Sequence, residues 1–290
     1  MTTPEHPALL SAEQLSEALH DPRLRVLDAS TSLVLDESTG SYMATPMREA
    51  YEEAHIPGAV FADVPGALSA PDATFDCTLP TGEYFAEQAG RLGIGNSSRV
   101  VVHDSGGAWA TRLWWLFRVF GHDNVSVLDG GKRAWTTAGL TVESGPRIPD
   151  PGRFTAHFRP ALAAGTEEVA TRDQEAVCLV NALDPATFRG EQEVNPYPRR
   201  GRIPGSENLP FDSLLDPATG TFLPPAVLRE KLDTTSLLRS GRPITYCGGG
   251  IAASLVAFAA YVVGQPAVAI YDGSLFEWTS DPGRPVDLGG

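Results

Sequence analysis

The sequence predicts an α/β protein built from two tandem copies of one domain, each a parallel sheet flanked by helices on both faces. Short apolar runs typical of buried strands alternate with helix-like segments along the chain, as in repeated strand–helix–strand units. Several motifs recur in the same order, 143 to 153 residues apart. The length of 290 residues agrees with two domains of about 150 residues each.

The expected strands come in pairs that occupy matching places in the two copies. The pairs are Val26–Ala29 with Leu179–Ala182, and Val100–His103 with Ile244–Tyr246. Helix-like segments accompany them at Ala12–Leu19, Thr111–Phe120 and Ala253–Val263. This alternation implies parallel sheets, whose ligands bind beyond the carboxyl ends of the strands.

Two motifs carry the internal repeat. His55-Ile56-Pro57-Gly58-Ala59 returns as Arg202-Ile203-Pro204-Gly205-Ser206, and Val127-Leu128-Asp129-Gly130-Gly131 returns as Ile270-Tyr271-Asp272-Gly273-Ser274. Repetition in this order indicates a duplication. A stretch rich in proline and glycine separates the copies. We therefore predict a first domain over residues 1–145, a linker over 146–165 and a second domain over 166–290.

The second copy contains the predicted nucleophile. The strand Ile244–Tyr246 stops at Cys247, three glycines follow, and a helical apolar run begins. Such a strand, loop and helix direct backbone N–H groups toward one point and place a sulfur there. The N–H groups and the helix dipole favour a thiolate, and the same loop would hold an anion. The matching position of the first copy is Asp104, so that copy is predicted to have lost the nucleophile.

The other cysteines and the histidines argue against several kinds of site. Cys178 lies in a predicted buried strand and Cys77 in a polar loop, and neither is assigned a role. No C-x-x-C pair exists, which excludes a zinc ribbon and a thioredoxin-type couple. All six histidines precede the second domain, which argues against a cysteine protease and against a metal site. His55 is interpreted as structural.

Three charged residues next to the motifs are also interpreted as structural. Asp104 is expected to support the inactive loop, and Arg112 is expected to form a salt bridge at the domain interface. Asp272 ends a strand and is expected to cap the turn that follows it.

Composition limits the partners and the compartment. A net charge of −14 argues against a general nucleic-acid or anionic-membrane binder, because such a protein needs a basic surface. The chain has no N-terminal apolar signal and no apolar run of about 18 residues. Three scattered cysteines favour a reducing compartment. These features predict a cytoplasmic protein.

In combination, the motifs resemble those of the rhodanese-like sulfurtransferases, specifically the two-domain type. The resemblance covers about Leu24 to Pro285 and includes both Ile-Pro-Gly motifs, both Asp-Gly motifs and the Cys247 loop. It implies an inactive first domain and an active second one. It also implies that the cysteine takes up a sulfane sulfur as a persulfide and passes it to cyanide or a thiol acceptor, such as thioredoxin or a sulfur-relay protein. The resemblance implies no metal and no organic cofactor.

The residues after the cysteine indicate the sulfur donor. Family members with basic residues there are similar to thiosulfate sulfurtransferases, whereas this uncharged loop is nearer to that of the 3-mercaptopyruvate sulfurtransferases. The predicted donor is therefore the small anion 3-mercaptopyruvate. The loop residues expected to bind it are Gly248, Gly249, Gly250, Ile251, Ala252 and Ala253.

The chain departs from the 3-mercaptopyruvate group at three positions. Gly249 stands in place of a loop serine proposed to assist catalysis, and Ala252 in place of a common threonine. Thr187 stands where the group commonly has an arginine for the substrate carboxylate. A guanidinium can grip a carboxylate bidentately. The expected substitutes are Arg189 and Arg202, with Arg199 and Arg200 beside them.

The residues leave other functions open. The nearby arginines are compatible with a thiosulfate:cyanide sulfurtransferase, and a non-catalytic sulfur carrier would need only the cysteine and its loop. A phosphatase of the same fold is disfavoured, because it would carry an arginine six residues after the cysteine, where this chain has Ala253.

Overall fold

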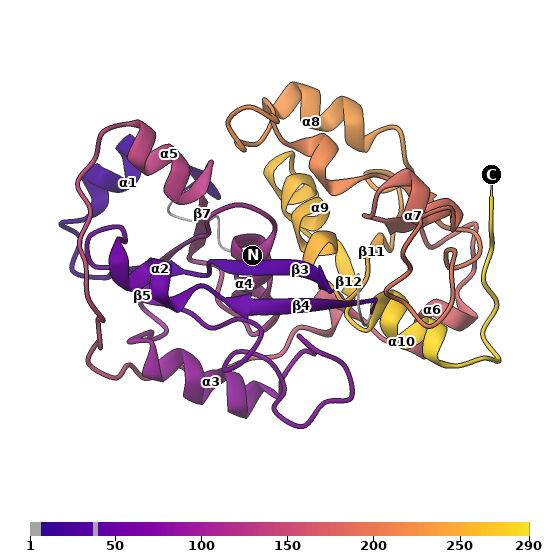
Figure 1. The fold of residues 1–290 in the computed structure, drawn as a ribbon, viewed down its shortest axis with the longest axis horizontal. Coiled ribbons are helices and arrows are strands. Elements are labelled where there is room, and N and C mark those ends of the chain that lie inside the picture. Colours follow the sequence, from indigo (N-terminus) through magenta and orange to yellow (C-terminus); the bar gives the residue numbers. More distant parts are fainter. Residues whose placement is uncertain (1–6, 37–39, 290) are drawn as a thin grey trace.

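The computed structural model describes residues 7–36 and 40–289, which form two similar halves (Figure 1). Each half contains a five-stranded, fully parallel sheet flanked by helices, so the predicted α/β class is confirmed. The only antiparallel pair among the named strands of this part of the chain is a hairpin in the first half.

The first half contains strands β1 (Leu9–Leu10), β2 (Leu24–Asp28), β3 (Thr31–Asp36), β4 (Ser41–Pro46), β5 (Val60–Phe61), β6 (Arg99–His103) and β7 (Val125–Leu128). Its helices are α1 (Ala12–Ala18), α2 (Arg48–Glu53), α3 (Gly82–Arg91), α4 (Trp109–Val119) and α5 (Gly131–Thr137).

The second half contains strands β8 (Ala163–Ala164), β9 (Leu179–Asn181), β10 (Glu207–Asn208), β11 (Ile244–Tyr246) and β12 (Ala269–Tyr271). Its helices are α6 (Thr166–Thr171), α7 (Pro185–Arg189), α8 (Pro225–Leu232), α9 (Ile251–Val262) and α10 (Ser274–Ser280). Two short 3₁₀ helices lie at Pro160–Leu162 and Phe211–Leu214.

The two sheets have the same strand order, which confirms the internal repeat. The first is ordered β1-β7-β6-β2-β5, and the second, read from its other edge, is ordered β8-β12-β11-β9-β10. The strand before Asp104 therefore matches the strand before Cys247 in position as well as in sequence. In both halves this strand lies at the centre of the sheet, between two parallel neighbours.

The segment between the halves has no helix or strand from residue 139 to 159, apart from one isolated bridge. The second sheet begins earlier than predicted, because Ala163 and Ala164 pair with β12 inside the segment assigned to the linker. The domain division at residues 145 and 165 remains a proposal. No helix in the described part of the chain is long and apolar enough to cross a membrane.

Helices α4 and α9 hold the two halves together at the centre of the molecule (Figure 1). All eleven residues of α4 are buried, because its own sheet covers one side and α9 lies against another. Trp114 meets Phe258 edge to face at 4.9 Å between ring centroids. Thr111 and Ser254 share a hydrogen bond of 2.9 Å between their hydroxyl oxygens. A single apolar core therefore spans both halves.

A buried ion pair also crosses the junction. Arg112 of α4 lies 2.6 Å from Asp272, and its guanidinium donates a 2.5 Å hydrogen bond to the carbonyl oxygen of Cys77. The other carboxylate oxygen of Asp272 accepts from the backbone N–H of Leu79 at 2.6 Å. The structural role expected for Arg112 is confirmed. Asp272, expected to cap its own turn, instead binds the other half of the molecule.

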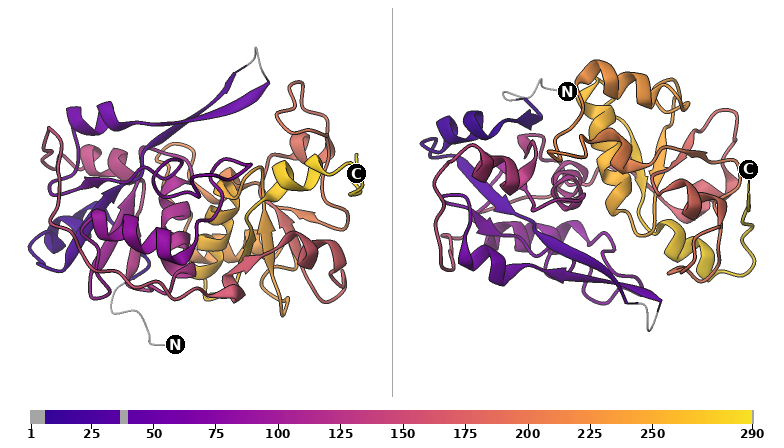
Figure 2. Two further views of the ribbon diagram at one scale, coloured as in Figure 1. Left: turned by 90° about the horizontal axis from the view of Figure 1, so that it is seen from below. Right: turned by 45° about the horizontal axis from the view of Figure 1, so that its top comes forward.

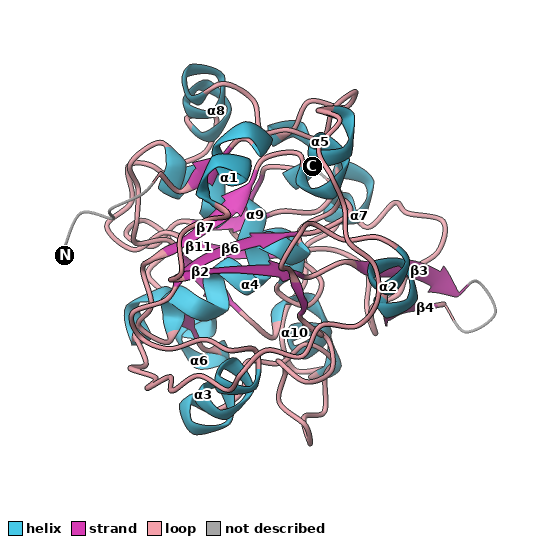
Figure 3. Cartoon of the chain, turned by 90° about the vertical axis from the view of Figure 1, so that its left-hand side faces the viewer, coloured by secondary structure: helices cyan, strands magenta, loops and turns pink. Residues whose placement is uncertain are grey.

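The hairpin β3–β4 extends from the first half toward the second and stands clear of the sheet (Figures 2 and 3). Apolar side chains on it are exposed, including Leu33, Val34 and Met43. Four residues of the hairpin line the cavity described below: Thr31, Leu33, Tyr42 and Ala44.

Replacing Arg112 with alanine should strongly destabilise the protein. The change leaves Asp272 and the Cys77 carbonyl without their charged partner, and removing one member of a buried pair costs about 3–5 kcal/mol. Urea unfolding followed by circular dichroism measures this loss. The matched control is Arg91→Ala, which breaks an exposed pair with Glu87, a kind of pair that contributes about 1 kcal/mol or less. Equal losses in the two variants would contradict the role assigned to Arg112.

Candidate active site

The Cys247 loop has the predicted geometry. Strand β11 ends at Tyr246, and α9 begins at Ile251 with Gly250 before it in the left-handed region, at φ 81°. The β-branched residues Ile244 and Thr245 favour the strand. Only glycine adopts the left-handed conformation without strain, so the chain turns into the helix at Gly250. Cys247 is 2 % exposed at the carboxyl end of the central strand.

Helix α10 turns the loop so that its N–H groups are free. The carbonyl oxygens of Cys247 and Gly248 accept hydrogen bonds from the first turn of α10, at 3.1 and 3.0 Å. Within the described residues, the N–H groups of Gly248, Gly249 and Gly250 have no protein acceptor. The loop therefore presents unsatisfied donors beside the sulfur, as an anion site requires.

Ser274, which the sequence did not predict as a site residue, holds the backbone of Cys247 through a hydrogen bond. It is fully buried, and its hydroxyl accepts the backbone N–H of Cys247 at 3.1 Å and donates to the carbonyl of Tyr271 at 2.8 Å. Its φ of 50° is unusual for a residue with a side chain and marks local backbone strain. Its place in the repeated Asp-Gly motif was the available signal.

The three glycines have different surroundings. A Cβ on Gly248 would lie 2.6 Å from the hydroxyl oxygen of Tyr197, and one on Gly250 would lie 2.7 Å from the Arg112 guanidinium. A Cβ on Gly249 would meet only the Phe276 ring, at 3.5 Å, which is an ordinary contact. Close packing therefore requires glycine at positions 248 and 250 but leaves room for a side chain at 249.

Cys247 opens onto a cavity of about 460 Å³ between the two halves. Both halves supply its walls, which include aromatic rings from Tyr42, Trp109, Tyr197, Phe211 and Phe276. Among the predicted loop residues, Gly248, Gly249, Ile251 and Ala252 line it, whereas Gly250 and Ala253 do not. Ala253 is fully buried.

Cys77, to which the sequence assigned no role, also lines this cavity. It is 6 % exposed, and its φ of 59° is strained for a residue with a side chain. Burial raises the pKa of its thiol to about 12, so the thiol is protonated at neutral pH. Its position follows from contacts of its backbone with Arg112, which no local pattern shows.

The charges in the cavity are negative. Asp76, Asp184 and Asp212 line it, and no lysine, arginine or histidine does among the described residues. Asp184 caps α7 through the N–H groups of Ala186 and Thr187. Asp76 and Asp212 are exposed, and their carboxylates have no hydrogen-bond or ion-pair partner in the described part of the chain.

The arginines predicted to hold a substrate are engaged elsewhere. Arg189 pairs with Glu191 at 2.8 Å. Arg202 stacks over the Phe188 ring at 4.6 Å and donates to the carbonyl of Gly289.

Arg199 and Arg200, which lie between Arg189 and Arg202 in the sequence, bind backbone carbonyls. Arg199 bonds to Thr279, Asp281 and Arg284, while Arg200 bonds to Gln192 and Glu193. None of these four arginines lines the cavity. Their guanidinium groups instead connect the segment before Ile203 to its own turns and to the C-terminal part of the chain.

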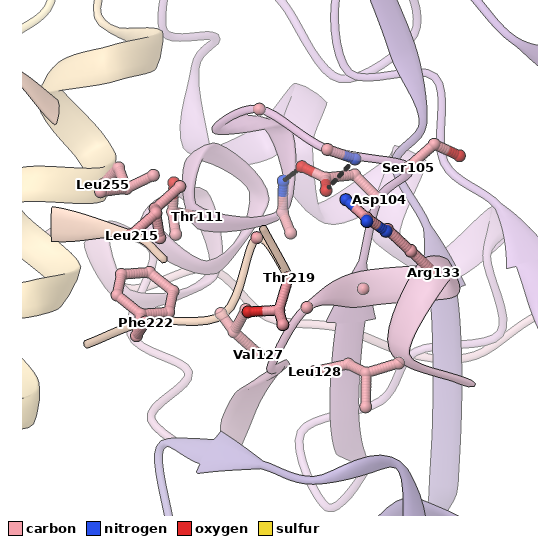
Figure 4. A pocket seen from close by; sticks show the side chains of 16 residues that line it. Asp104, Ser105, Thr111, Val127, Leu128, Arg133, Leu215, Thr219, Phe222 and Leu255 are labelled. Atoms are coloured by element: carbon pink, nitrogen blue, oxygen red, sulfur yellow. Dashed lines mark hydrogen bonds between the residues drawn. The ribbon is translucent and has the colours of Figure 1, made fainter. Parts of the chain in front are cut away.

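The matching loop of the first half is closed by its own side chain. Figure 4 shows that the Asp104 carboxylate accepts hydrogen bonds from the N–H groups of Gly106 and Ala110, each at 2.9 Å. The aspartate thus occupies the position that an anion would take, although burial raises its pKa. A cavity of only about 120 Å³ remains beside it. The structural role expected for Asp104 agrees with these contacts.

His55 likewise has the surroundings of a structural residue. It is 2 % exposed, its Nδ1 lies 2.9 Å from the carbonyl oxygen of Tyr51, and its ring stacks on that tyrosine at 4.3 Å. It does not line the Cys247 cavity.

Comparison with known proteins agrees with this architecture. The family model of the rhodanese-like domain matches residues 11–138 and again residues 170–281. The 3-mercaptopyruvate sulfurtransferase of Homo sapiens is 38% identical, over 97% of this chain and 94% of that protein. The thiosulfate sulfurtransferase of Bos taurus is 37% identical, over 93% of this chain and 91% of that protein.

A solved structure leads to the same family. The SseA protein of Escherichia coli, described among 3-mercaptopyruvate sulfotransferases with the rhodanese fold, superposes with a TM-score of 0.79 at 29% identity. The match covers 93% of this chain and 99% of that one. With a family match in each half and relatives of this identity over nearly its whole length, the chain belongs to the rhodanese-like family.

Proposed function

We propose that this protein is a sulfurtransferase that takes a sulfane sulfur from 3-mercaptopyruvate onto Cys247 and passes it to a thiol or to cyanide. The observation that carries the proposal is a buried cysteine at the end of a central strand, beside unsatisfied loop N–H groups and open to a cavity. Relatives named as 3-mercaptopyruvate and thiosulfate sulfurtransferases support the same reaction class.

The chemistry proceeds in two sulfur transfers. The Cys247 thiolate attacks the donor sulfur, an S–S bond forms, and the donor C–S bond breaks. The electron pair of that bond leaves with pyruvate as its enolate, which then takes a proton from water. An acceptor thiolate next attacks the outer sulfur, and the S–S bond to Cys247 breaks. Its electron pair returns to Cys247 as the thiolate, which the loop N–H groups stabilise.

The charge of the cavity favours 3-mercaptopyruvate over thiosulfate. Carboxylates line the cavity and no cationic side chain among the described residues does, so a dianion is repelled more than a monoanion. The donor carboxylate then relies on neutral hydrogen-bond donors. These are the loop N–H groups and the indole N–H of Trp109, which is 3 % exposed and has no protein acceptor in the described residues.

The size of the cavity suits a second, larger reactant. A volume of 460 Å³ is in the usual range for a small-molecule site and exceeds what a three-carbon donor fills. A thiol, including the exposed cysteine of a thioredoxin or of a sulfur-relay protein, is the proposed acceptor. The three cysteines are unpaired, which agrees with a reducing compartment, and we propose the cytoplasm.

Cys247→Ser should abolish sulfur transfer, because serine cannot form the persulfide. Intact-protein mass spectrometry after incubation with 3-mercaptopyruvate should show the gain of one sulfur atom in the wild-type protein and none in the Cys247→Ser variant. Cys178→Ser is the control, since Cys178 is buried outside the cavity. Sulfur uptake and pyruvate release by Cys247→Ser at the normal rate would refute the proposal. Uptake without turnover in the presence of thiols would indicate a carrier instead.

The loop glycines should differ in their tolerance of side chains. Gly249→Ser should keep the melting temperature and still form a persulfide, because its side chain has room against Phe276. Gly248→Ala should lose persulfide formation, since its methyl group would displace the Tyr197 hydroxyl or the loop. Melting curves and the mass assay compare the two variants. Equal behaviour would show that Tyr197 does not constrain the loop.

Salt should accelerate the reaction with an anionic donor. Raising ionic strength from about 0.01 M to 0.15 M shortens the Debye length from about 30 Å to about 8 Å and screens the cavity carboxylates. Asp76→Asn and Asp212→Asn should each raise kcat/KM for 3-mercaptopyruvate about two- to fivefold at low salt. Glu87→Gln, far from the cavity, is the control. A rate that falls with salt would instead indicate a cationic group at the site, as the arginine hypothesis requires.

A further inference from the structure

Tyr197 stands in an unusual position beside the Cys247 loop. It comes from the irregular segment between α7 and β10, is 6 % exposed and lines the cavity. Its ring packs edge to face on Phe276, with 5.0 Å between centroids. Its hydroxyl oxygen faces the backbone of Gly248 so closely that a Cβ there would lie 2.6 Å away. The phenol therefore ends at the residue that directly follows the cysteine.

The Tyr197 hydroxyl has no hydrogen-bond partner among the described residues. Its oxygen is accessible from the cavity, so a ligand bound there can accept the hydrogen bond that the phenol offers. The other hydroxyls lining the cavity differ. Thr31 donates to the carbonyl of Ala29, and Tyr42 lies on the exposed hairpin, 37 % accessible. Among the described residues, Tyr197 thus has a largely buried side chain whose hydroxyl reaches the cavity without a protein partner.

The segment around Tyr197 is held in place. Arg199 binds the carbonyls of Thr279, Asp281 and Arg284 at 2.7 to 3.1 Å, which fastens the segment to the end of α10. The side-chain amide of Asn195 donates to the Tyr197 carbonyl at 2.5 Å. Because α10 also binds the carbonyls of the Cys247 loop, both the phenol and the loop are positioned by the same helix. A donor fixed before the reaction needs no reorganisation when charge develops.

The surroundings keep the phenol protonated. Burial raises the pKa of Tyr197 well above its usual value, and its proximity to Cys247 raises it further. At neutral pH the group is therefore a hydrogen-bond donor and not a base.

We propose that the hydroxyl of Tyr197 is a catalytic hydrogen-bond donor of this site, a role that rests on the proposed sulfur transfer from 3-mercaptopyruvate. As the S–S bond forms and the C–S bond breaks, negative charge moves from the Cys247 sulfur to the enolate oxygen of the leaving pyruvate. The phenol O–H donates to that charge and keeps its proton, while water protonates the enolate afterwards. The loop itself offers no side-chain hydroxyl here, since residue 249 is glycine, and Tyr197 supplies one beside Gly248 from the segment between α7 and β10.

The test is the single-turnover rate of persulfide formation on Cys247, measured by rapid quench and mass spectrometry over a range of 3-mercaptopyruvate concentrations. Tyr197→Phe keeps the ring that packs on Phe276 and removes only the hydroxyl. The limiting rate should fall about a hundredfold, the effect of losing one such donor, while the half-saturating donor concentration and the melting temperature stay unchanged. Tyr271→Phe, which removes a buried hydroxyl outside the cavity, should keep the wild-type rate.

A rescue experiment separates the hydroxyl from packing. In the double variant Tyr197→Phe/Gly249→Ser, a new hydroxyl enters from the loop, where the structure has room, and the rate should recover about tenfold. A Tyr197→Phe rate within about threefold of wild type would overturn the proposal, as would a slow variant that Gly249→Ser does not rescue. If the unmodified protein takes up no sulfur from 3-mercaptopyruvate, the proposed function fails, and the role of Tyr197 with it.

Discussion

The structure depends most on the ion pair between Arg112 and Asp272. Arg112 is buried in α4 of the first half, and Asp272 follows the last strand of the second half. Together they bind the backbone at Cys77 and Leu79, and the guanidinium packs directly behind Gly250. One pair thus sets the distance between the halves, the path of the segment carrying Cys77, and the back of the Cys247 loop. The cavity in front of Cys247 exists because these three positions are fixed together.

The two loops at the ends of the matching central strands show how one backbone serves two purposes. Both place N–H groups around a point after the strand. In the first half the Asp104 carboxylate accepts two of those groups and closes the loop. In the second half the side chain is a thiol, the loop carbonyls bind α10, and the N–H groups stay open to the cavity. The difference lies in one side chain. Asp104 accepts the loop N–H groups of the first half, whereas Cys247 leaves those of the second half free to bind an anion.

The sequence predicted those features that local pattern determines. The duplicated parallel sheets, the strand–loop–helix at Cys247 and the interface position of Arg112 follow from periodicity, glycine spacing and the repeat itself. Cys77, Ser274 and Tyr197 were not identified as site residues, because contacts with residues distant in sequence bring them there. The arginines at 189 and 202 were predicted from their places within two motifs, yet Arg189 pairs with Glu191, and Arg202 contacts the Phe188 ring and the carbonyl of Gly289. A charged side chain in a motif can bind a substrate only if the folded protein has not already given it another partner.

The complete burial of α4 has a consequence for how the protein can change over evolutionary time. The first half has Asp104 where the second has Cys247, yet it still shapes the surroundings of that cysteine. Here the first half covers α9, provides Trp109 and Asp76 to the cavity, and holds the ion pair behind the reactive loop. Loss of this half would leave the apolar side of α9 in water and the sulfur without a surrounding wall. A substitution in the silent copy that disturbs these contacts would therefore reach the reactive site as directly as one in the reactive copy.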